Sequence, residues 1–363
     1  MGRLGPLLGV RAPALLGVDI GSSAVKVLEL GRGARGYSVN ACAIEPLPAG
    51  MVSDDGQIAD VEPVGEAVRR AVARAGTRAR HGAVAVPGTL VIDKHISLAA
   101  GLRDQDMEDQ IRAEADQHIA FPLDEVQLDF VPVGTTADDD TSVDVLLVAC
   151  RKEHVEARVA AIELAGLQAR VVDIETYALE GACHLLLDQL PDGGQGRTVA
   201  LVDVGATTSS MLVLDNLRHV YAHDQNFGGN QLTEEIARHF EMKPDEAEKA
   251  KLAGELPPAY MEELLPHFYD DLAQQIQRAM QYFSAGSRTA RHTVDDLLLA
   301  GGSARLPGIA EAISDRLQLK AKVAEPFAKV KVSGRARAKQ VRDEGPALLL
   351  AAGLAMRAFD ERR

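Results

Sequence analysis

The sequence predicts an α/β fold made of two related lobes, and two observations favour it. A strand–turn–strand pattern around Asp19 recurs around Asp203, about half a chain length further along the 363 residues. A third glycine turn follows near Gly301, between an apolar stretch and a helical pattern. Repetition on this scale indicates duplicated units, and alternating strands, glycine turns and helices are typical of α/β proteins. Because 46% of the residues are hydrophobic, the chain can bury a large core.

The first copy, LLGVDIGSSAVKVLEL at residues 15–30, has a carboxylate where an apolar strand ends. Burying the Asp19 carboxylate without a partner is costly. Glycine and small hydroxyl residues in the turn let a ligand approach the main chain closely, and successive N–H groups there can hold phosphate oxygens. The candidate phosphate-binding residues of this turn are Gly21, Ser22, Ser23 and, as a point charge returning from the next strand, Lys26.

The second copy, TVALVDVGATTSSMLVL at residues 198–214, aligns Asp203 with Asp19. Either hairpin alone could be a plain surface turn, but two copies facing each other would clamp a polyphosphate from both sides. Mg²⁺ prefers oxygen ligands and keeps several waters. Asp19 and Asp203 are therefore candidates to hold Mg²⁺ through water. The phosphate-binding candidates of the second turn are Gly205, Ala206, Thr207 and Thr208.

The third glycine turn lies in DDLLLAGGSARLPGIAEAISDRL, residues 295–317. We expect a buried strand at 297–299, a tight turn, and a helix over 306–317 with Pro307 near its start. A turn of this kind lets a flat ligand approach, although an ordinary βα turn gives the same pattern. The candidate nucleoside-binding residues here are Gly301, Gly302, Ser303 and Arg305, whose guanidinium can stack on a base or pair with a phosphate.

Taken together, the three elements resemble the ATPase fold of actin, hexokinase and Hsp70. VDIGSSAVK is similar to its phosphate-1 motif, VDVGATTSS to its phosphate-2 motif and AGGSARLPGI to its adenosine motif. The resemblance implies a duplicated, ribonuclease H-like, two-lobed fold with ATP and Mg²⁺ as cofactors. It also implies two helical connectors, at 171–186 and 344–357, with small residues where the helices cross.

Within this superfamily the chain most resembles the PilM family of type IV pilus assembly proteins, relatives of the division protein FtsA. The stretches that carry the resemblance are IEPLP (44–48), AVAVPGTLVIDKHISL (83–98), DMEDQIRAEADQHIAFPLDEVQLDFVPVG (106–134) and FGGNQLTEEIA (227–237). The family implies an FtsA-type subdomain 1C at 85–168. The other subdomains would be 1A (1–84, 169–196 and 340–363), 2A (197–226 and 296–339) and 2B (227–295).

The pattern inside 85–168 fits such an insertion. We expect a strand, a helix over 104–119 ended by Pro122, and a strand over 125–133. An acidic turn at 138–140, interpreted as a solvated hairpin tip, a strand over 143–150 and a helix over 151–165 follow.

Catalytic ability is less clearly indicated than binding. Hydrolysis needs a group that orients the attacking water, and Glu175 in the first connector is the candidate, although a carboxylate there can also serve as a helix N-terminal charge. Ser210 stands where actin has a phosphate-2 histidine, so we expect slow or absent turnover. Glu248 and Lys251 resemble the pair that reaches ribose and adenine in relatives, or form an ordinary i,i+3 pair on an exposed helix.

Charge and hydropathy limit the partners. The net charge of −14 argues against nucleic acid or an anionic membrane as the main partner, and no apolar run reaches the roughly 18 residues of a membrane span. The resemblance implies a cytoplasmic scaffold, peripheral at the inner membrane, that grips the N-terminal tail of PilN in a 1A/1C groove and contacts pilus motor ATPases or their regulators. Alternatives are an FtsA-like filament protein, a small-molecule kinase and a type II secretion component.

Overall fold

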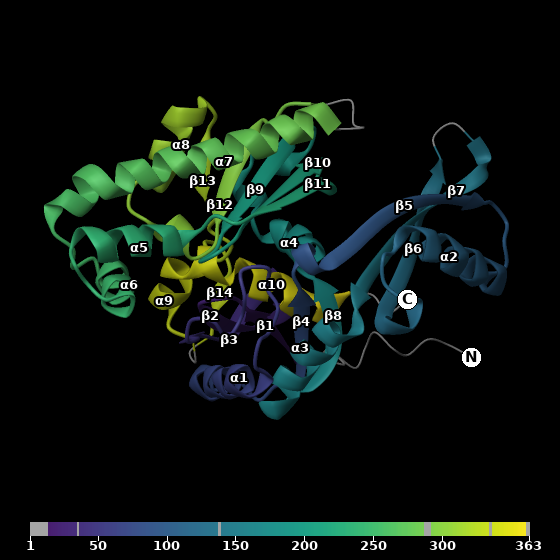
Figure 1. Cartoon of the computed structure of the whole chain (residues 1–363), viewed down its shortest axis with the longest axis horizontal. Coiled ribbons are helices and arrows are strands. Elements are labelled where there is room, and N and C mark those ends of the chain that lie inside the picture. The colour runs from purple at the N-terminus through teal and green to yellow at the C-terminus, as the bar shows by residue number, and fades with distance from the viewer. Residues whose placement is uncertain (1–13, 35, 137–138, 287–291, 334–335, 361–363) are drawn as a thin grey trace.

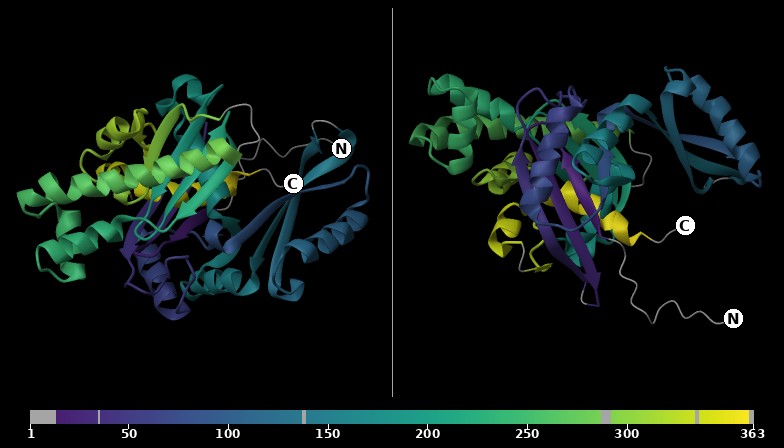
Figure 2. Two further views of the ribbon diagram at one scale, coloured as in Figure 1. Left: turned by 45° about the horizontal axis from the view of Figure 1, so that its top comes forward. Right: turned by 90° about the horizontal axis from the view of Figure 1, so that it is seen from below.

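Two β-sheets with helices between and outside them form the body of the protein (Figure 1). The computed structural model describes residues 14–34, 36–136, 139–286, 292–333 and 336–360. The layers run from helices below the first sheet, through a pair of helices between the sheets, to helices above the second sheet. A smaller third sheet projects to one side of this body (Figures 1 and 2).

The first sheet belongs to the N-terminal lobe and has the order β14-β3-β2-β1-β4-β8. Its strands are β1 (Leu15–Ile20), β2 (Ala24–Gly33), β3 (Gly36–Pro46), β4 (His81–Val86), β8 (Gln168–Ile174) and β14 (Lys331–Val332). Its outer face packs on α1 (Val61–Ala75) and α3 (Lys152–Leu164). Every residue of β1 is buried because helices cover both faces of the sheet.

The second sheet has the order β11-β10-β9-β12-β13 and repeats the antiparallel hairpin of the first. Its strands are β9 (Thr198–Val204), β10 (Ser209–Asp215), β11 (Arg218–Gln225), β12 (Asp296–Ala300) and β13 (Ala321–Val323). The helices of this lobe are α5 (Gly229–His239), α6 (Pro244–Ala253), α7 (Leu265–Gly286), which follows a π-helical turn at Tyr260–Leu264, and α8 (Ile309–Leu317).

Two helices cross between the sheets, α4 (Glu175–Ala182) and α10 (Leu349–Met356). They lie so close that a Cβ added to Gly353 would come within 1.9 Å of the Ala178 carbonyl oxygen. The prediction of small residues at the crossing is confirmed. The first connector is shorter than predicted, because residues 171–174 complete β8 at the edge of the first sheet and the helix begins only at Glu175.

The third sheet, β5-β7-β6, matches the pattern predicted for the insertion. It consists of β5 (Val91–Ala99), β6 (Val126–Thr136) and β7 (Asp139–Arg151), with α2 (Asp104–His118) packed on one face. Asp138 of the predicted acidic turn lies outside the described residues. Helix α3 follows as predicted but packs on α1 and β4, where Ile162 is fully buried in the core of the first lobe.

The helix after the third glycine turn starts later than predicted, at Ile309 instead of Leu306. Leu306 is extended, with ψ of 140°, because a residue before proline avoids the α region. Gly308 then takes a positive φ of 72° before α8 begins. The remaining helical elements are α9 (Ala338–Asp343) and short 3₁₀ turns at Gly88–Leu90, Leu123–Glu125, Cys183–Leu185, Leu187–Gln189, Pro191–Gly194, Ser303–Arg305, Gly345–Leu348 and Arg357–Phe359.

Candidate functional site

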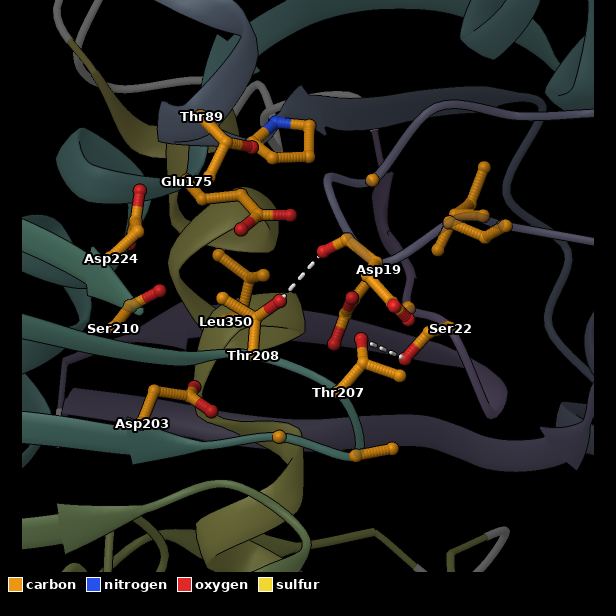
Figure 3. Close-up of a pocket in the computed structure, with 18 of the residues that line it drawn as sticks. Asp19, Ser22, Thr89, Glu175, Asp203, Thr207, Thr208, Ser210, Asp224 and Leu350 are labelled. Carbon is orange, nitrogen blue, oxygen red and sulfur yellow. Dashed lines mark hydrogen bonds between the residues drawn. The ribbon is translucent and has the colours of Figure 1, made fainter. Parts of the chain in front are cut away.

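The two glycine turns named from the sequence face each other across a cleft between the lobes (Figure 3). Each turn closes with the same hydrogen bond, from Gly21 N to Ala24 O over 3.1 Å and from Gly205 N to Thr208 O over 3.0 Å. The identical closure shows that the two hairpins are structural equivalents. Thr207 Oγ1 also donates to Ser22 Oγ over 3.0 Å, so the turns touch directly.

In the first hairpin the carboxylate has a cation partner. Asp19 and Lys26 are paired across β1 and β2, and Lys26 Nζ lies 2.9 Å from Asp19 Oδ2. Asp19 is only 4% exposed. Burial by itself would lower the pKa of Lys26, but the carboxylates of Asp19, Asp203 and Glu175 outweigh it and raise the pKa. Lys26 therefore stays positively charged beside Asp19, near the end of β1.

The second hairpin has no such cation. Ser210 occupies the position of Lys26, opposite Asp203 on the neighbouring strand. Among the described residues no basic side chain forms an ion pair with Asp203. Burial, with help from Asp19 and Asp224 and against the charge of Lys26, raises the pKa of Asp203 to about 6. A buried carboxylate without an ion-pair partner favours the approach of a cation, because an opposite charge stabilises its ionised form.

Glu175 is the first residue of α4 and lines the cleft. Burial is the main cause that raises the pKa of its carboxyl to about 8, with a further contribution from the charge of Asp19 and an opposing one from Arg158. At neutral pH most of the Glu175 carboxyl groups therefore carry a proton. A protonated carboxyl donates a hydrogen bond and is a poor general base.

The structure adds Asp224, which the sequence analysis missed. It lies on β11 opposite Ser210. Burial raises the pKa of the Asp224 carboxyl, and the nearby Ser210 hydroxyl opposes this rise. Its Oδ2 would be 2.7 Å from a Cβ added to Gly88 of the first lobe. Asp19 is identified from the sequence because it ends an apolar strand; β11 is RHVYAHDQ, in which every residue is at least partly exposed, so the same signal does not mark Asp224.

A loop of the first lobe also lines the cleft, although no sequence motif predicted it. Ser53, Asp54, Asp55 and Gly56 line the cavity. Thr208 Oγ1 of the second lobe donates to Asp54 O over 2.8 Å. The cleft cavity has a volume of about 110 Å³, below the roughly 300–1,000 Å³ of typical ligand pockets.

The third glycine turn contacts the second glycine turn, residues 205–208. Ser303 Oγ donates to Gly205 O over 3.0 Å, and Gly301, with φ of 86°, leaves no space for a Cβ beside Asp203 Oδ1, 2.5 Å away. Gly302 faces open space. The side chain of Arg305 is exposed and does not line the cleft cavity.

Glu248 and Lys251 do lie beside this turn. Lys251 Nζ is 2.6 Å from Glu248 Oε2, and it donates to Thr233 Oγ1 over 2.6 Å and to Gly229 O over 3.1 Å. The Lys251 side chain is only 8% exposed, so the alternative of an exposed surface pair is wrong for this lysine. A Cβ added to Gly229 would come within 2.5 Å of Ser303 Oγ, so α5, α6 and the third turn meet here.

The donor set of the cleft fits a hydrated magnesium ion. Six acidic side chains line it, those of Asp19, Asp54, Asp55, Glu175, Asp203 and Asp224, together with one ammonium group, that of Lys26. Within the described ranges no three His, Cys, Asp or Glu side chains are placed to hold a metal ion. Because Mg²⁺ prefers oxygen ligands and keeps several waters, these carboxylates can hold it through water.

A second cavity of about 240 Å³ lies between the first lobe and the third sheet. Two of its apolar side chains are unusually exposed, Ile92 at 37% and Phe121 at 40%. The Arg151 guanidinium lies over the Phe121 ring, 5.1 Å from its centroid. The lining is completed by Gln57, Thr89, Leu90, Val91, Ile119, Val126, Ala149, Cys150 and His154.

Comparison with known proteins assigns the chain to a family. The family model described as type IV pilus assembly protein PilM matches residues 17–359. The chain belongs to the PilM family. The structure titled PilM-PilN type IV pilus biogenesis complex is similar, with a TM-score of 0.80 and 26% sequence identity over 96% of this chain and 99% of that one. The resemblance to PilM proteins is thus confirmed.

Two more distant structures show the fold of this PilM family member alone. The ethanolamine utilization protein EutJ from Carboxydothermus hydrogenoformans has a TM-score of 0.55 and 17% identity, covering 95% of this chain and 89% of that one. The archaeal actin homolog Ta0583 has a TM-score of 0.50 and 12% identity, covering 96% and 100%. The predicted actin-like ATPase fold is confirmed. In the part of the chain that the structure describes, no helix is long and apolar enough to cross a membrane.

Proposed function

We propose that this PilM family protein is an ATP-binding scaffold of the type IV pilus inner-membrane assembly platform, and that it holds the N-terminal cytoplasmic tail of PilN. The main support for the proposed ATP site is that two equivalent glycine turns meet at the base of the interlobe cleft, where Thr207 contacts Ser22. Both turns offer main-chain N–H groups and hydroxyls, the donors that phosphate oxygens need.

Magnesium is part of the proposal because of charge. A triphosphate entering a cleft lined by six acidic side chains and one lysine would meet strong repulsion. Asp19 and Asp203 would hold hydrated Mg²⁺ beside the phosphates, and Lys26 would contact the phosphates directly. Lys251, Glu248 and the Gly301–Ser303 turn would flank the nucleoside end.

Turnover should be slow or absent. Ser210 provides no positive charge beside Asp203, and Glu175 is mostly protonated at neutral pH. Neither group is then well suited to activate water for attack on a phosphoryl group. Bound ATP would serve to set the relative closure of the lobes, since a ligand favours the state with which it makes more contacts.

The second cavity is the proposed place for the PilN tail. It combines exposed apolar side chains, Ile92 and Phe121, with the polar tips of Arg151 and His154, which suits a short peptide with apolar anchors. The similar solved structure is titled as a PilM-PilN complex. The protein would then lie in the cytoplasm and reach the inner membrane through PilN, and contacts to motor ATPases or their regulators would follow from that position.

Calorimetry tests the nucleotide site. Mg–ATP should bind the unmodified protein. Asp203→Ala and Asp19→Ala should each weaken this binding at least about tenfold. When EDTA removes the metal, the same two substitutions should weaken ATP binding by a smaller factor. Asp188→Ala is the matched control, because Asp188 is an exposed acid paired with Lys329 and does not line the cleft. Equal ATP affinity in all four proteins would rule out the proposed site.

Point variants test the tail pocket. Ile92→Asp places a charge in its apolar lining and should abolish binding of a synthetic PilN tail. Val133→Asp is the control, since Val133 is 57% exposed on β6 and does not line the cavity. Deleting residues 85–168 is a poorer test, because it removes the fully buried Ala161 and Ile162 of α3 from the first lobe. Undiminished binding to Ile92→Asp would exclude this pocket.

A further inference from the structure

Two carbonyl groups of the second glycine turn accept hydrogen bonds from the first turn of α5. Gly229 N donates to Gly205 O over 3.0 Å, and Asn230 N donates to Ala206 O over 2.8 Å. A carbonyl held in this way cannot rotate without losing its hydrogen bond. Helix α5 therefore fixes the directions of both carbonyls of the turn.

The same hydrogen bonds set the direction of two N–H groups of the turn. In a trans peptide unit the N–H and C=O bonds point in opposite directions, so the N–H groups of Ala206 and Thr207 point away from α5. Both residues line the cleft, whereas Gly229 and Asn230 do not. Within the described parts of the chain, neither N–H group donates to a main-chain carbonyl. Both groups are therefore available to phosphate oxygens in the cleft.

The contact between α5 and the turn leaves no room for side chains at the start of the helix. A Cβ added to Gly228 would lie 2.5 Å from Ala206 O, and one added to Gly229 would lie 2.5 Å from Ser303 Oγ. A larger residue at either position would push α5 away from the turn. The two glycines therefore let the N–H groups of the helix reach the carbonyls of the turn.

Lys251 of α6 holds the first turn of α5 in place. The two helices lie side by side in the second lobe (Figure 1). An ammonium group has three N–H donors, and that of Lys251 has three protein acceptors: Glu248 Oε2 and Thr233 Oγ1, each at 2.6 Å, and Gly229 O at 3.1 Å. Because the protein uses all three donors of this 8% exposed side chain, none is left for a nucleotide.

Thr233, in the second turn of α5, belongs to the same network and is 6% exposed. Its hydroxyl accepts from Lys251 Nζ and donates to Glu248 Oε2 over 2.5 Å. The Glu248 side chain is 38% exposed, so its carboxylate can turn to water when a partner is removed. Loss of Lys251 would then release Gly229 O without leaving a buried charge unpaired.

We infer that Lys251 and Thr233 are positioning residues for phosphate binding. They hold α5 against the second glycine turn, so that the N–H groups of Ala206 and Thr207 face the phosphates of a bound nucleotide. The inference rests on the proposed function, because it needs a nucleotide in the cleft. Lys251 flanks the nucleoside end but does not recognise ribose or base. Its effect must then be the same for all nucleotides that share a triphosphate.

Calorimetric titrations with Mg–ATP, Mg–2′-deoxy-ATP and Mg–ITP test the inference, because these ligands share a triphosphate and differ in ribose or base. Lys251→Met removes the ammonium group and should weaken binding of all three ligands at least about fivefold. The ratios between the three dissociation constants should stay within about twofold of those of the unmodified protein. Thr233→Val removes the hydroxyl and should weaken all three equally, whereas Thr233→Ser keeps the hydroxyl and should restore binding.

Lys329→Met is the matched control, because Lys329 is an exposed lysine paired with Asp188 and does not line the cleft; it should leave all three affinities unchanged. Should Lys251→Met not fold, the comparison of Thr233→Val with Thr233→Ser still decides the matter. Unchanged affinities without the Lys251 ammonium, or a loss that differs between the three nucleotides, would overturn the inference and leave the proposed function intact. Failure of the unmodified protein to bind any of the three would overturn both.

Discussion

Thr207 Oγ1 and Ser22 Oγ lie 3.0 Å apart and join two turns that are 185 residues apart in sequence. Each hydroxyl belongs to a glycine turn that we propose to bind phosphate, and here the Thr207 hydroxyl donates to that of Ser22. The bond from Thr208 to Asp54 reinforces the contact. The cleft is therefore closed at its base, and any ligand placed between the turns must first take the place of these hydrogen bonds.

A reversible crosslink tests whether the turns must part. In Ser22→Cys/Thr207→Cys the two sulfur atoms can approach bonding distance. Oxidation should lock the cleft and weaken Mg–ATP binding at least about tenfold, and dithiothreitol should restore it; calorimetry of both forms checks this. The native thiols should not interfere, because burial raises the pKa of Cys42 to about 11 and that of Cys183 to about 12, and also raises the pKa of Cys150. Unchanged ATP affinity after oxidation, with Ser22→Cys alone as control, would contradict the expectation.

Lys26 has a structural and a binding role that a double variant can separate. Lys26→Met leaves the 4% exposed Asp19 carboxylate without its cation and should cost about 2 kcal/mol or more in stability. Asp19→Asn/Lys26→Met removes both charges and should regain most of the lost melting temperature. Its ATP affinity should nevertheless stay at least about tenfold below that of Asp19→Asn alone, because the phosphates lose their point charge. Equal affinities of these two variants, measured by calorimetry, would show that Lys26 acts on folding only.

Glu175 should make stability depend on pH. Its folded-state pKa of about 8 lies above the ordinary value of 4.5, so the folded state binds the proton more tightly, and stability falls as pH rises from about 4.5 to about 8. Glu175→Gln cannot ionise. Its melting temperature relative to the unmodified protein should therefore rise between pH 5.5 and pH 8.5. The exposed Glu234→Gln should show no such trend, and a flat difference for Glu175→Gln would refute the raised pKa.

The crossing of α4 and α10 predicts a sharp contrast between two glycines. A Cβ at Gly353 would lie 1.9 Å from Ala178 O, so Gly353→Ala must push the helices apart and should cost about 1–3 kcal/mol or more. Gly181, on α4, has nothing within 4 Å of its added Cβ, and Gly181→Ala should be neutral or stabilising. Thermal melts compare the two. Similar melting temperatures would mean that the crossing is looser than described.

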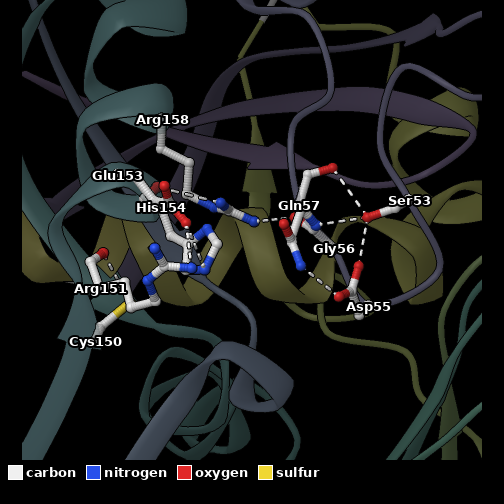
Figure 4. Close-up of polar contacts among 9 residues, drawn as sticks. All are labelled: Ser53, Asp55, Gly56, Gln57, Cys150, Arg151, Glu153, His154 and Arg158. Carbon is white, nitrogen blue, oxygen red and sulfur yellow. Dashed lines mark hydrogen bonds and ion pairs between the residues drawn. The ribbon is translucent and has the colours of Figure 1, made fainter. Parts of the chain in front are cut away.

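The sequence revealed those parts of the site that are continuous in the chain. Asp19 to Lys26 and Asp203 to Thr208 each form one hairpin, so their chemistry could be interpreted locally. Asp224 reaches the cleft through its pairing with Ser210, and strand register is set by the whole sheet. The loop Ser53–Gln57 contains no sequence motif or repeat. Its position depends on a hydrogen bond that Gly56 O accepts from Arg158, 102 residues away in the sequence (Figure 4).

Of the two helices that begin later than predicted, only α8 has a cause that the local sequence already contains. The extended conformation of Leu306 follows from Pro307 and delays the start of α8. The late start of α4 has another cause, since the parallel pairing of β8 with β4 keeps residues up to Ile174 in the sheet. Pairing between distant strands overrides a helical tendency, so the second boundary required the tertiary structure.

The third sheet leaves and rejoins the first lobe at one point, because Val91 at the start of β5 pairs with Cys150 near the end of β7. A segment whose two ends are neighbours can be exchanged for another folded unit with the same end spacing. A circularly permuted fluorescent protein could be grafted there in place of the native strands. The body of this protein would then serve as the sensing half of an optical reporter for whatever ligand moves its lobes.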